Sequence, residues 1–236
     1  MTQHEPGNDY PLSEVPQHAR KGLASMAMVL LGFTFFTATM FAGGKLGVAF
    51  DFTTLLVVIL VGNLLLGIYA ASLGYIAFKS GLNTVLMGRF CFGERGSKLS
   101  DLILGFTQIG WYAWGTATAA VVLGKYFQLD PGAVLGLMLL FGMAFCATAY
   151  IGYRGLEILS WIAVPAMGLL LLLSMWVATR QIGGLDGLLG VTPSASLDLS
   201  SAITLVFGTF VSGATQATNW TRFSRSARVA VSASLI

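Results

Sequence analysis

Long apolar stretches recur along this chain, and they limit its fold more than any other feature. Six of them are long enough to cross a hydrocarbon core, which needs about 20 residues of α-helix. The stretches run from Leu23 to Gly44, Thr54 to Phe78, Asp101 to Leu123, Pro131 to Ile151, Leu156 to Thr179 and Ala202 to Asn219, and a seventh begins near Val229. We therefore expect an all-α integral membrane protein with six transmembrane helices and the start of a seventh.

Composition supports a membrane environment. Charged residues make up only 10% of the 236 positions and the mean hydropathy is +0.78, whereas about 25% of the residues of a soluble domain are charged. The first 22 residues are polar and show no signal-peptide pattern, so we expect no signal peptide to be removed.

The basic residues predict the orientation of the chain. Threading it through six spans places only Lys45, Lys125 and Arg180 on one side. The other side receives Arg20, Lys21, Lys79, Arg89, Arg95, Lys98, Arg154, Arg222, Arg225 and Arg228. By the positive-inside rule the richer side is cytoplasmic, so we expect a multi-pass protein of the cell inner membrane with a cytoplasmic N-terminus. The net charge of +3 is spread over short loops rather than gathered on one face, which argues against nucleic-acid binding.

The first and sixth stretches share an order of residue types. Thr34-Phe35-Phe36-Thr37-Ala38 and Thr209-Phe210-Val211-Ser212-Gly213 both run hydroxyl, aromatic, bulky, hydroxyl, small. With five spans per repeat the two stretches cross in opposite directions, which is the pattern of inverted-repeat transporters with broken helices. Breaking a helix at mid-membrane frees backbone groups that a cation and a polar substrate can bind. The alternative is two ordinary helices rich in Gly and Thr.

The third stretch carries the most specific polar feature. Gln108, Trp111 and Trp114 are spaced by three and share one helical face. Trp111 lies near mid-depth, away from the headgroups where interfacial tryptophans belong. An amide beside an indole suits a flat, polar, neutral heterocycle, which stacks on the ring while the amide donates and accepts along its edge. Both residues also have structural explanations. The Gln108 amide could hydrogen-bond a neighbouring helix, and Phe210 could belong to the apolar core.

Ionisable groups are missing from the depth of the six stretches. Asp101 and Glu157 lie at cytoplasmic ends and Lys45 at an external one, while both histidines precede the first stretch. Proton pumps usually hold an ionisable relay within the membrane, so a sodium ion held by neutral oxygens fits better. A membrane-embedded enzyme would need an acid, nucleophile or metal cluster at depth, so we expect neither an enzyme nor a cofactor.

Several motifs in the same order resemble the nucleobase cation symporter family, and most closely its bacterial cytosine permeases. They lie between Val15 and the end of the chain: Val15-Pro16-Gln17-His18-Ala19-Arg20-Lys21-Gly22, the Leu31 to Gly44 stretch, Gly62-Asn63-Leu64-Leu65-Leu66-Gly67-Ile68-Tyr69, Gly88-Arg89-Phe90-Cys91-Phe92-Gly93 and Thr107-Gln108-Ile109-Gly110-Trp111. The resemblance implies the leucine-transporter fold, in which ten of twelve helices form two inverted repeats. It divides this chain into a cytoplasmic tail (1–22), helices 1 to 5 as the first repeat (23–179), an external connection (180–201), and helix 6 with the start of helix 7 (202–236).

The resemblance also implies roles for individual residues. Trp111 and Phe210 would stack on opposite faces of the substrate, and Gln108 would bind the base edge. Ser212 and Gly213 match an unwound stretch of the sixth helix, and Phe36 lies beside the substrate pocket. Gly32 and Phe35 match positions whose backbone carbonyls bind sodium between the first and eighth helices.

The chain departs from the family pattern in two places. Asn219 stands where cytosine permeases tend to have Asp, which would alter a charge pairing at that cytoplasmic end, well away from the expected pocket. The chain also stops at Ile236, where the family continues for nearly as many residues again, so the rest of the sodium site and of the base recognition is missing and we expect no transport by these residues alone.

Four functional hypotheses follow. The first is import of cytosine coupled to sodium by alternating access, with a nucleobase, a sodium ion and the lipid bilayer as partners. The second keeps the fold but changes the cargo to a purine, hydantoin, allantoin or thiamine-precursor ring, or changes the ion to a proton. The third is a nonfunctional truncated fragment, and the fourth is the membrane-embedded enzyme.

Overall fold

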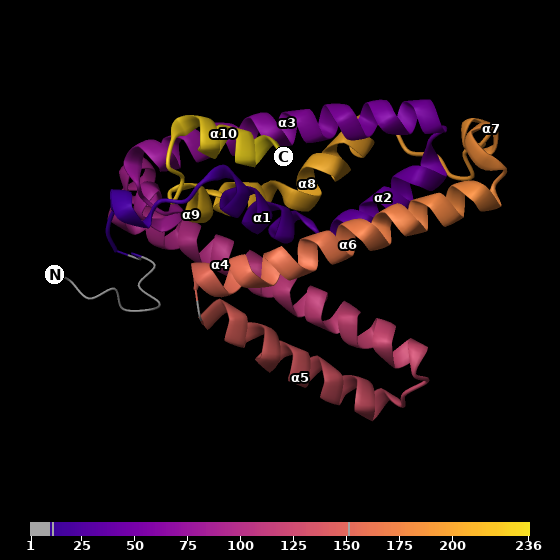
Figure 1. The fold of residues 1–236 in the computed structure, drawn as a ribbon, viewed down its shortest axis with the longest axis horizontal. Helices are drawn as coiled ribbons and strands as arrows, with labels where there is room; N and C mark the ends of the chain where they lie inside the picture. The colour runs from indigo at the N-terminus through magenta and orange to yellow at the C-terminus, as the bar shows by residue number, and fades with distance from the viewer. Residues whose placement is uncertain (1–9, 11, 151) are drawn as a thin grey trace.

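The chain folds into long helices that run along one axis of the molecule (Figure 1). The computed structural model describes residues 10, 12–150 and 152–236, without the side chains at 148 and 149. In chain order the elements are η1 (Gln17–Ala19), α1 (Leu23–Thr34), α2 (Thr37–Ala49), α3 (Phe52–Ser80), α4 (Thr84–Tyr126), α5 (Pro131–Tyr150), α6 (Tyr153–Gln181), α7 (Gly184–Leu189), α8 (Leu199–Gln216), α9 (Thr218–Thr221) and α10 (Ala227–Leu235).

The first apolar stretch is a broken helix, as the sequence predicts. α1 and α2 meet at an angle of 61°. Phe35 (φ −71°, ψ 81°) and Phe36 (φ −128°, ψ 140°) have non-helical backbone between them. The N–H of Phe35 donates to the Leu31 carbonyl and closes α1, so the following carbonyls lie beyond the end of its hydrogen-bond ladder.

The six apolar stretches are helical except at Phe35, Phe36 and Ala217, and residue 151 lies outside the described residues. Within that described part, α3 and α6 are each long and apolar enough to cross a membrane, and the bent pair α1 and α2 qualifies as one further span. The apolar part of α5, Pro131–Ala147, is shorter. Crossing by all six stretches therefore stays a prediction.

The third stretch belongs to a much longer helix than expected. α4 runs over 43 residues and holds one non-helical residue, Gly93 (φ 67°, ψ −178°). Its start is capped by the Asn83 side chain, which accepts from the N–H of Leu86 at 2.9 Å. The helix thus begins in the expected cytoplasmic loop and continues through Gln108 and Trp111.

The unwinding expected at Ser212 and Gly213 is wrong in this structure. α8 is continuous to Gln216 and turns only at Ala217. Its backbone groups are satisfied within the helix, and the hydroxyls of Thr209 and Thr215 add bonds to the carbonyls of Val206 (2.8 Å) and Val211 (2.9 Å). A break would free those groups without supplying new partners, so the helical form is the stable one.

Part of the core lies where α3 and α8 pack together, and a larger buried cluster joins α1 to Tyr153 of α6 and to Ala217, Phe223 and Ala233. Gly62 of α3 faces Val206 of α8, and an added Cβ at Gly62 would lie 2.6 Å from the valine Cγ1. Val58 is fully buried beside them. Small residues permit this close approach, which membrane helices use in place of hydrophobic pressure.

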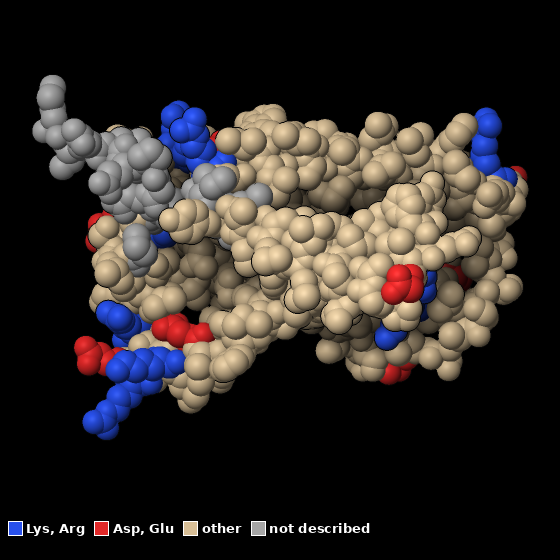
Figure 2. Space-filling view, turned by 90° about the horizontal axis from the view of Figure 1, so that it is seen from below, with Lys and Arg blue, Asp and Glu red and all other residues tan. Residues whose placement is uncertain are grey.

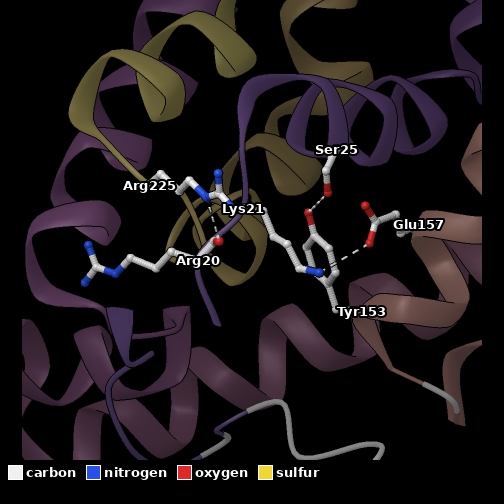
Figure 3. A network of polar contacts seen from close by, with 6 residues as sticks. All are labelled: Arg20, Lys21, Ser25, Tyr153, Glu157 and Arg225. Carbon is white, nitrogen blue, oxygen red and sulfur yellow. Dashed lines mark hydrogen bonds and ion pairs between the residues drawn. The ribbon is translucent and has the colours of Figure 1, made fainter. Parts of the chain in front are cut away.

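Charged side chains lie toward the two ends of the long axis, with an uncharged surface between them (Figure 2). At the end with the N-terminal tail, Lys21 pairs with Glu157 of α6 at 3.6 Å (Figure 3). Ser25 of α1 hydrogen-bonds the Tyr153 hydroxyl at 3.2 Å, and Arg225 Nε donates to the Arg20 carbonyl at 3.1 Å. The described part of the tail is therefore fastened to the helices.

Asn219 caps a helix at that same end. Its Oδ1 accepts from both the N–H and the hydroxyl of Thr84, each at 3.0 Å, and so joins α9 to the start of α4. The neutral amide fills a place where a helix N-terminus would also favour a carboxylate. Asn219 does not line the cavity described below.

Candidate functional site

A cavity of about 190 Å³ lies at the break between α1 and α2. Three segments that are far apart in sequence enclose it: the end of α1 with the break, the middle of α4, and the second half of α8. Its lining residues are Gly32, Phe33, Phe35, Phe36, Gln108, Trp111, Thr209, Phe210, Ser212 and Gly213. All eight residues named from the sequence are among them.

The break supplies backbone oxygens to this cavity. Gly32 lies in the last turn of α1, where carbonyls have no partner further along the helix, and Phe35 lies in the non-helical link. Gly32 also packs closely on α6, because an added Cβ would lie 3.1 Å from Ser160 Cβ. Neutral carbonyls at a helix break are the groups that bind sodium in broken-helix transporters.

Aromatic rings form the walls of the cavity. Phe36 meets Trp111 edge to face, with ring centroids 5.5 Å apart and an interplanar angle of 83°. Phe33 meets Phe210 at 5.7 Å and 70°. The rings of Trp111 and Phe210 are thus each supported by a phenylalanine of the α1 segment, and both present apolar surface to one cavity.

Gln108 brings an unsatisfied polar group to these walls. Its Nε2 is buried and has no hydrogen-bond partner among the described residues. A buried donor left unpaired costs about 1–3 kcal/mol, and an acceptor on a bound ligand would remove that cost. The alternative of a bond to a neighbouring helix finds no partner for this Nε2 in the described structure.

Gly213 contributes differently from the expectation. It is helical, and an added Cβ would lie 2.9 Å from two ring carbons of Phe210 and 3.2 Å from Phe33. Its missing side chain therefore gives the two rings their room. Phe33 and Thr209 also line the cavity but were not predicted as site residues from the sequence. Their positions could have indicated it, because Phe33 lies between Gly32 and Phe35, and Thr209 lies one turn before Ser212.

Two neighbouring hollows share part of this set: one of about 450 Å³ includes Phe33, Phe36, Gln108 and Trp111, and one of about 400 Å³ includes Phe35, Thr209 and Phe210. Another, of about 610 Å³, lies at the turn between α4 and α5 and is lined by Val121, Lys125 and Gln128 among others. No group of three or more His, Cys, Asp or Glu that could hold a metal occurs in the described part of the chain. The 190 Å³ cavity has no ionisable lining residue, so its chemistry is that of aromatic faces, hydroxyls, one amide and backbone oxygens.

Comparison with known proteins gives three findings. Residues 14–236 match a family described as permeases for cytosine/purines, uracil, thiamine and allantoin. The cytosine permeases of Escherichia coli K12 and O157:H7 are each 42% identical over 229 residues, which cover 97% of this chain and 54% of those proteins. The chain therefore spans about half the length of these curated relatives.

The third finding concerns the fold alone. The structure of Mhp1, a nucleobase-cation-symport-1 family transporter in a closed conformation with bromovinylhydantoin bound, superposes with a TM-score of 0.85 at 16% identity. The match covers 95% of this chain and 53% of that one. The all-helical fold expected from the sequence is thus that of this transporter's first half.

Proposed function

This chain belongs to the family of permeases for cytosine/purines, uracil, thiamine and allantoin, and on that premise we propose that the protein imports cytosine together with sodium by alternating access. Import is across the inner membrane, with the N-terminus in the cytoplasm. This orientation follows from the positive-inside rule, because threading the chain through six spans puts ten basic residues on the side of the N-terminus and three on the opposite side. The similarity to the cytosine permeases of Escherichia coli supports this choice of base.

One observation carries the proposal: a ring-sized cavity holds both an indole wall and an unpaired buried amide donor. Its volume of about 190 Å³ is below the roughly 300 Å³ at which pockets for drug-sized ligands begin, so it suits a single small ring. A flat base lies between Trp111 and Phe210, and its carbonyl oxygen or ring nitrogen accepts from Gln108 Nε2. Ser212 and Phe36 line the same space.

Sodium binds on the α1 side of this cavity. Gly32 and Phe35 line the space where α1 ends and supply carbonyl oxygens that the helix does not use. A cation there stabilises the break, and the break positions Phe36 against Trp111. Ion and base therefore favour the same arrangement, which is what coupling requires.

The test of this proposal is uptake of labelled cytosine by cells that lack their own permease and carry the full-length gene. We expect uptake that rises with an inward sodium gradient and persists when the pH gradient is collapsed. Uptake that ignores sodium and disappears with the pH gradient would replace sodium by a proton. No cytosine uptake by protein that reaches the membrane would reject the substrate.

Replacing Gln108 tests the amide separately. We expect Gln108→Leu to raise the KM for cytosine by roughly 5- to 150-fold, because the variant keeps the side chain's bulk but loses about 1–3 kcal/mol of hydrogen bonding. Thr107→Ala is the matched control, since the Thr107 hydroxyl donates to the Ile103 carbonyl of its own helix and does not line the cavity. Equal KM values for both variants would contradict the role of Gln108.

A second candidate cargo is another flat ring of the same family, such as a purine, allantoin, a hydantoin or a thiamine precursor. Stacking between aromatic faces accepts any planar heterocycle, so Trp111 and Phe210 do not by themselves choose among them. Competition of unlabelled rings against labelled cytosine separates the two cases. A ring that competes better than cytosine would be the preferred substrate.

A further inference from the structure

The first part of α4 projects an apolar tip at the end of the molecule where the basic residues gather. Phe90 is 82% exposed and Phe92 is 64% exposed, with the exposed Cys91 between them. Arg89 precedes this tip in sequence and Arg95 follows it. The segment Arg89–Lys98, here called the basic-aromatic tip, has no part in the cavity.

Gly93 creates the tip. Its backbone (φ 67°, ψ −178°) is in a region that is essentially restricted to glycine. The break folds the start of α4 back onto the helix that follows, because an added Cβ at Gly88 would lie 3.6 Å from Ser100 Oγ and 3.8 Å from Ser97 Cβ. Asn219 holds the other end at Thr84. The tip is therefore a fixed feature rather than a loose loop.

The depth of the tip matches the headgroup layer. Exposed apolar residues begin directly after it, with Leu99 59%, Leu102 56% and Ile103 58% exposed, as expected of a helix that faces lipid. Gly93 lies six residues before Leu99, about 9 Å along the helix. One headgroup layer is about 5–7 Å thick, so Gly93 lies just outside it, and the rest of the tip, which folds back toward Ser97 and Ser100, lies within it.

Charge at the tip is unbalanced. Arg89, Arg95 and Lys98 are all exposed, and among the described residues none of them has a carboxylate within ion-pair distance. Glu94 is the one acidic residue of the segment. Aromatic side chains flanked by basic ones are typical of segments that lie in the interface of an anionic membrane.

We propose that the basic-aromatic tip binds anionic phospholipid of the cytoplasmic leaflet, with Phe90 and Phe92 inserted into the headgroup layer and Arg89, Arg95 and Lys98 on the phosphates. The inference does not depend on the cargo or on the coupling ion. It gives the Gly88–Gly93 motif a role that substrate recognition leaves unexplained. The tip would anchor the end of α4 whose middle carries Gln108 and Trp111.

A polarity-sensitive dye on Cys91 tests the proposal in the full-length protein with its other cysteines replaced by serine. The protein is reconstituted in vesicles of phosphatidylcholine, alone or with phosphatidylglycerol. We expect phosphatidylglycerol to shift the emission to shorter wavelength and to reduce quenching by iodide, and high salt to reverse both changes. Equal emission and quenching in the two lipids, whether the dye is exposed or shielded, would overturn the proposal.

Three variants locate the effect. The first is the triple variant Arg89→Gln/Arg95→Gln/Lys98→Gln. It should need a phosphatidylglycerol fraction more than about 10-fold higher for half of the emission shift, since each basic residue near an anionic surface contributes about 5-fold in membrane affinity. Gly93→Ala should lose the response because alanine cannot adopt the break. A dye at Tyr126→Cys, beside the single Lys125 at the other end of α4, is the matched control and should respond several-fold less. A triple variant that responds like the parent would overturn the role of charge.

Discussion

Trp111→Ala should reduce cytosine uptake at low substrate concentration by roughly 5- to 150-fold, because stacking of a base on an aromatic side chain is worth about 1–3 kcal/mol. The loss also removes the ring that supports Phe36 across 5.5 Å. Trp111→Phe should retain part of the activity, since a smaller ring still offers a π face. The measurement is initial uptake rate against cytosine concentration, normalised to the amount of protein in the membrane.

Trp114→Ala is the matched control for this result. Trp114 lies one turn further along α4 and also contacts Phe36, at 5.7 Å, but it does not line the 190 Å³ cavity. We expect its rate to stay within about 3-fold of the parent, because no stacking energy is lost. Equal losses in the two variants would mean that the aromatic cluster as a whole, and not the face of Trp111, sustains uptake.

Gly62→Ala should destabilise the packing of α3 against α8. The new Cβ would lie 2.6 Å from Val206 Cγ1 and 2.7 Å from Val206 Cβ, and neither atom is the free end of a flexible chain. Overpacking of this kind costs about 1–3 kcal/mol, so the melting temperature of the purified protein should fall. The measurement is thermal unfolding in detergent.

Gly110→Ala provides the comparison within another span. An added Cβ there meets nothing within 4 Å, and alanine favours the helix by up to about 1 kcal/mol over glycine, so its melting temperature should stay the same or rise. Gly62→Ala/Val206→Gly should recover part of the loss, because the second change removes both crowded atoms. A Gly62→Ala protein as stable as Gly110→Ala would show that α3 and α8 separate without cost.

Part of the site follows from local geometry and is readable from the sequence. Gln108 and Trp111 share a face because three residues nearly complete a helical turn. A break in the first stretch was expected from the resemblance and from the residue order, and the structure confirms it and places it at Phe35 and Phe36. The shared face of Gln108 and Trp111 needs only the chain's own spacing, so it does not depend on which helix packs next.

The parallel with the sixth stretch shows where sequence order stops being informative. Thr209 to Gly213 repeats the residue types of Thr34 to Ala38, yet α8 stays helical through Gly213 while the α1 stretch breaks. Whether a helix breaks depends on what its freed carbonyls and amides would meet, and that is decided by neighbours far away in the chain. The same holds for Gly213, whose role comes from the Phe33 ring beside it.

The sequence by itself determined that this is an all-helical membrane protein of the transporter type, which residues carry stacking and hydrogen-bonding groups, and which helix faces they share. Only the tertiary structure decided that Gly32, Phe35, Phe36, Gln108 and the α8 residues line one cavity, that Phe33 and Thr209 join them, and that Asn219 caps α4. The physical reason is that helical spacing is local, whereas a cavity is made where α1, α4 and α8 cross, and their crossing is set by side-chain packing between segments about 70 to 180 residues apart.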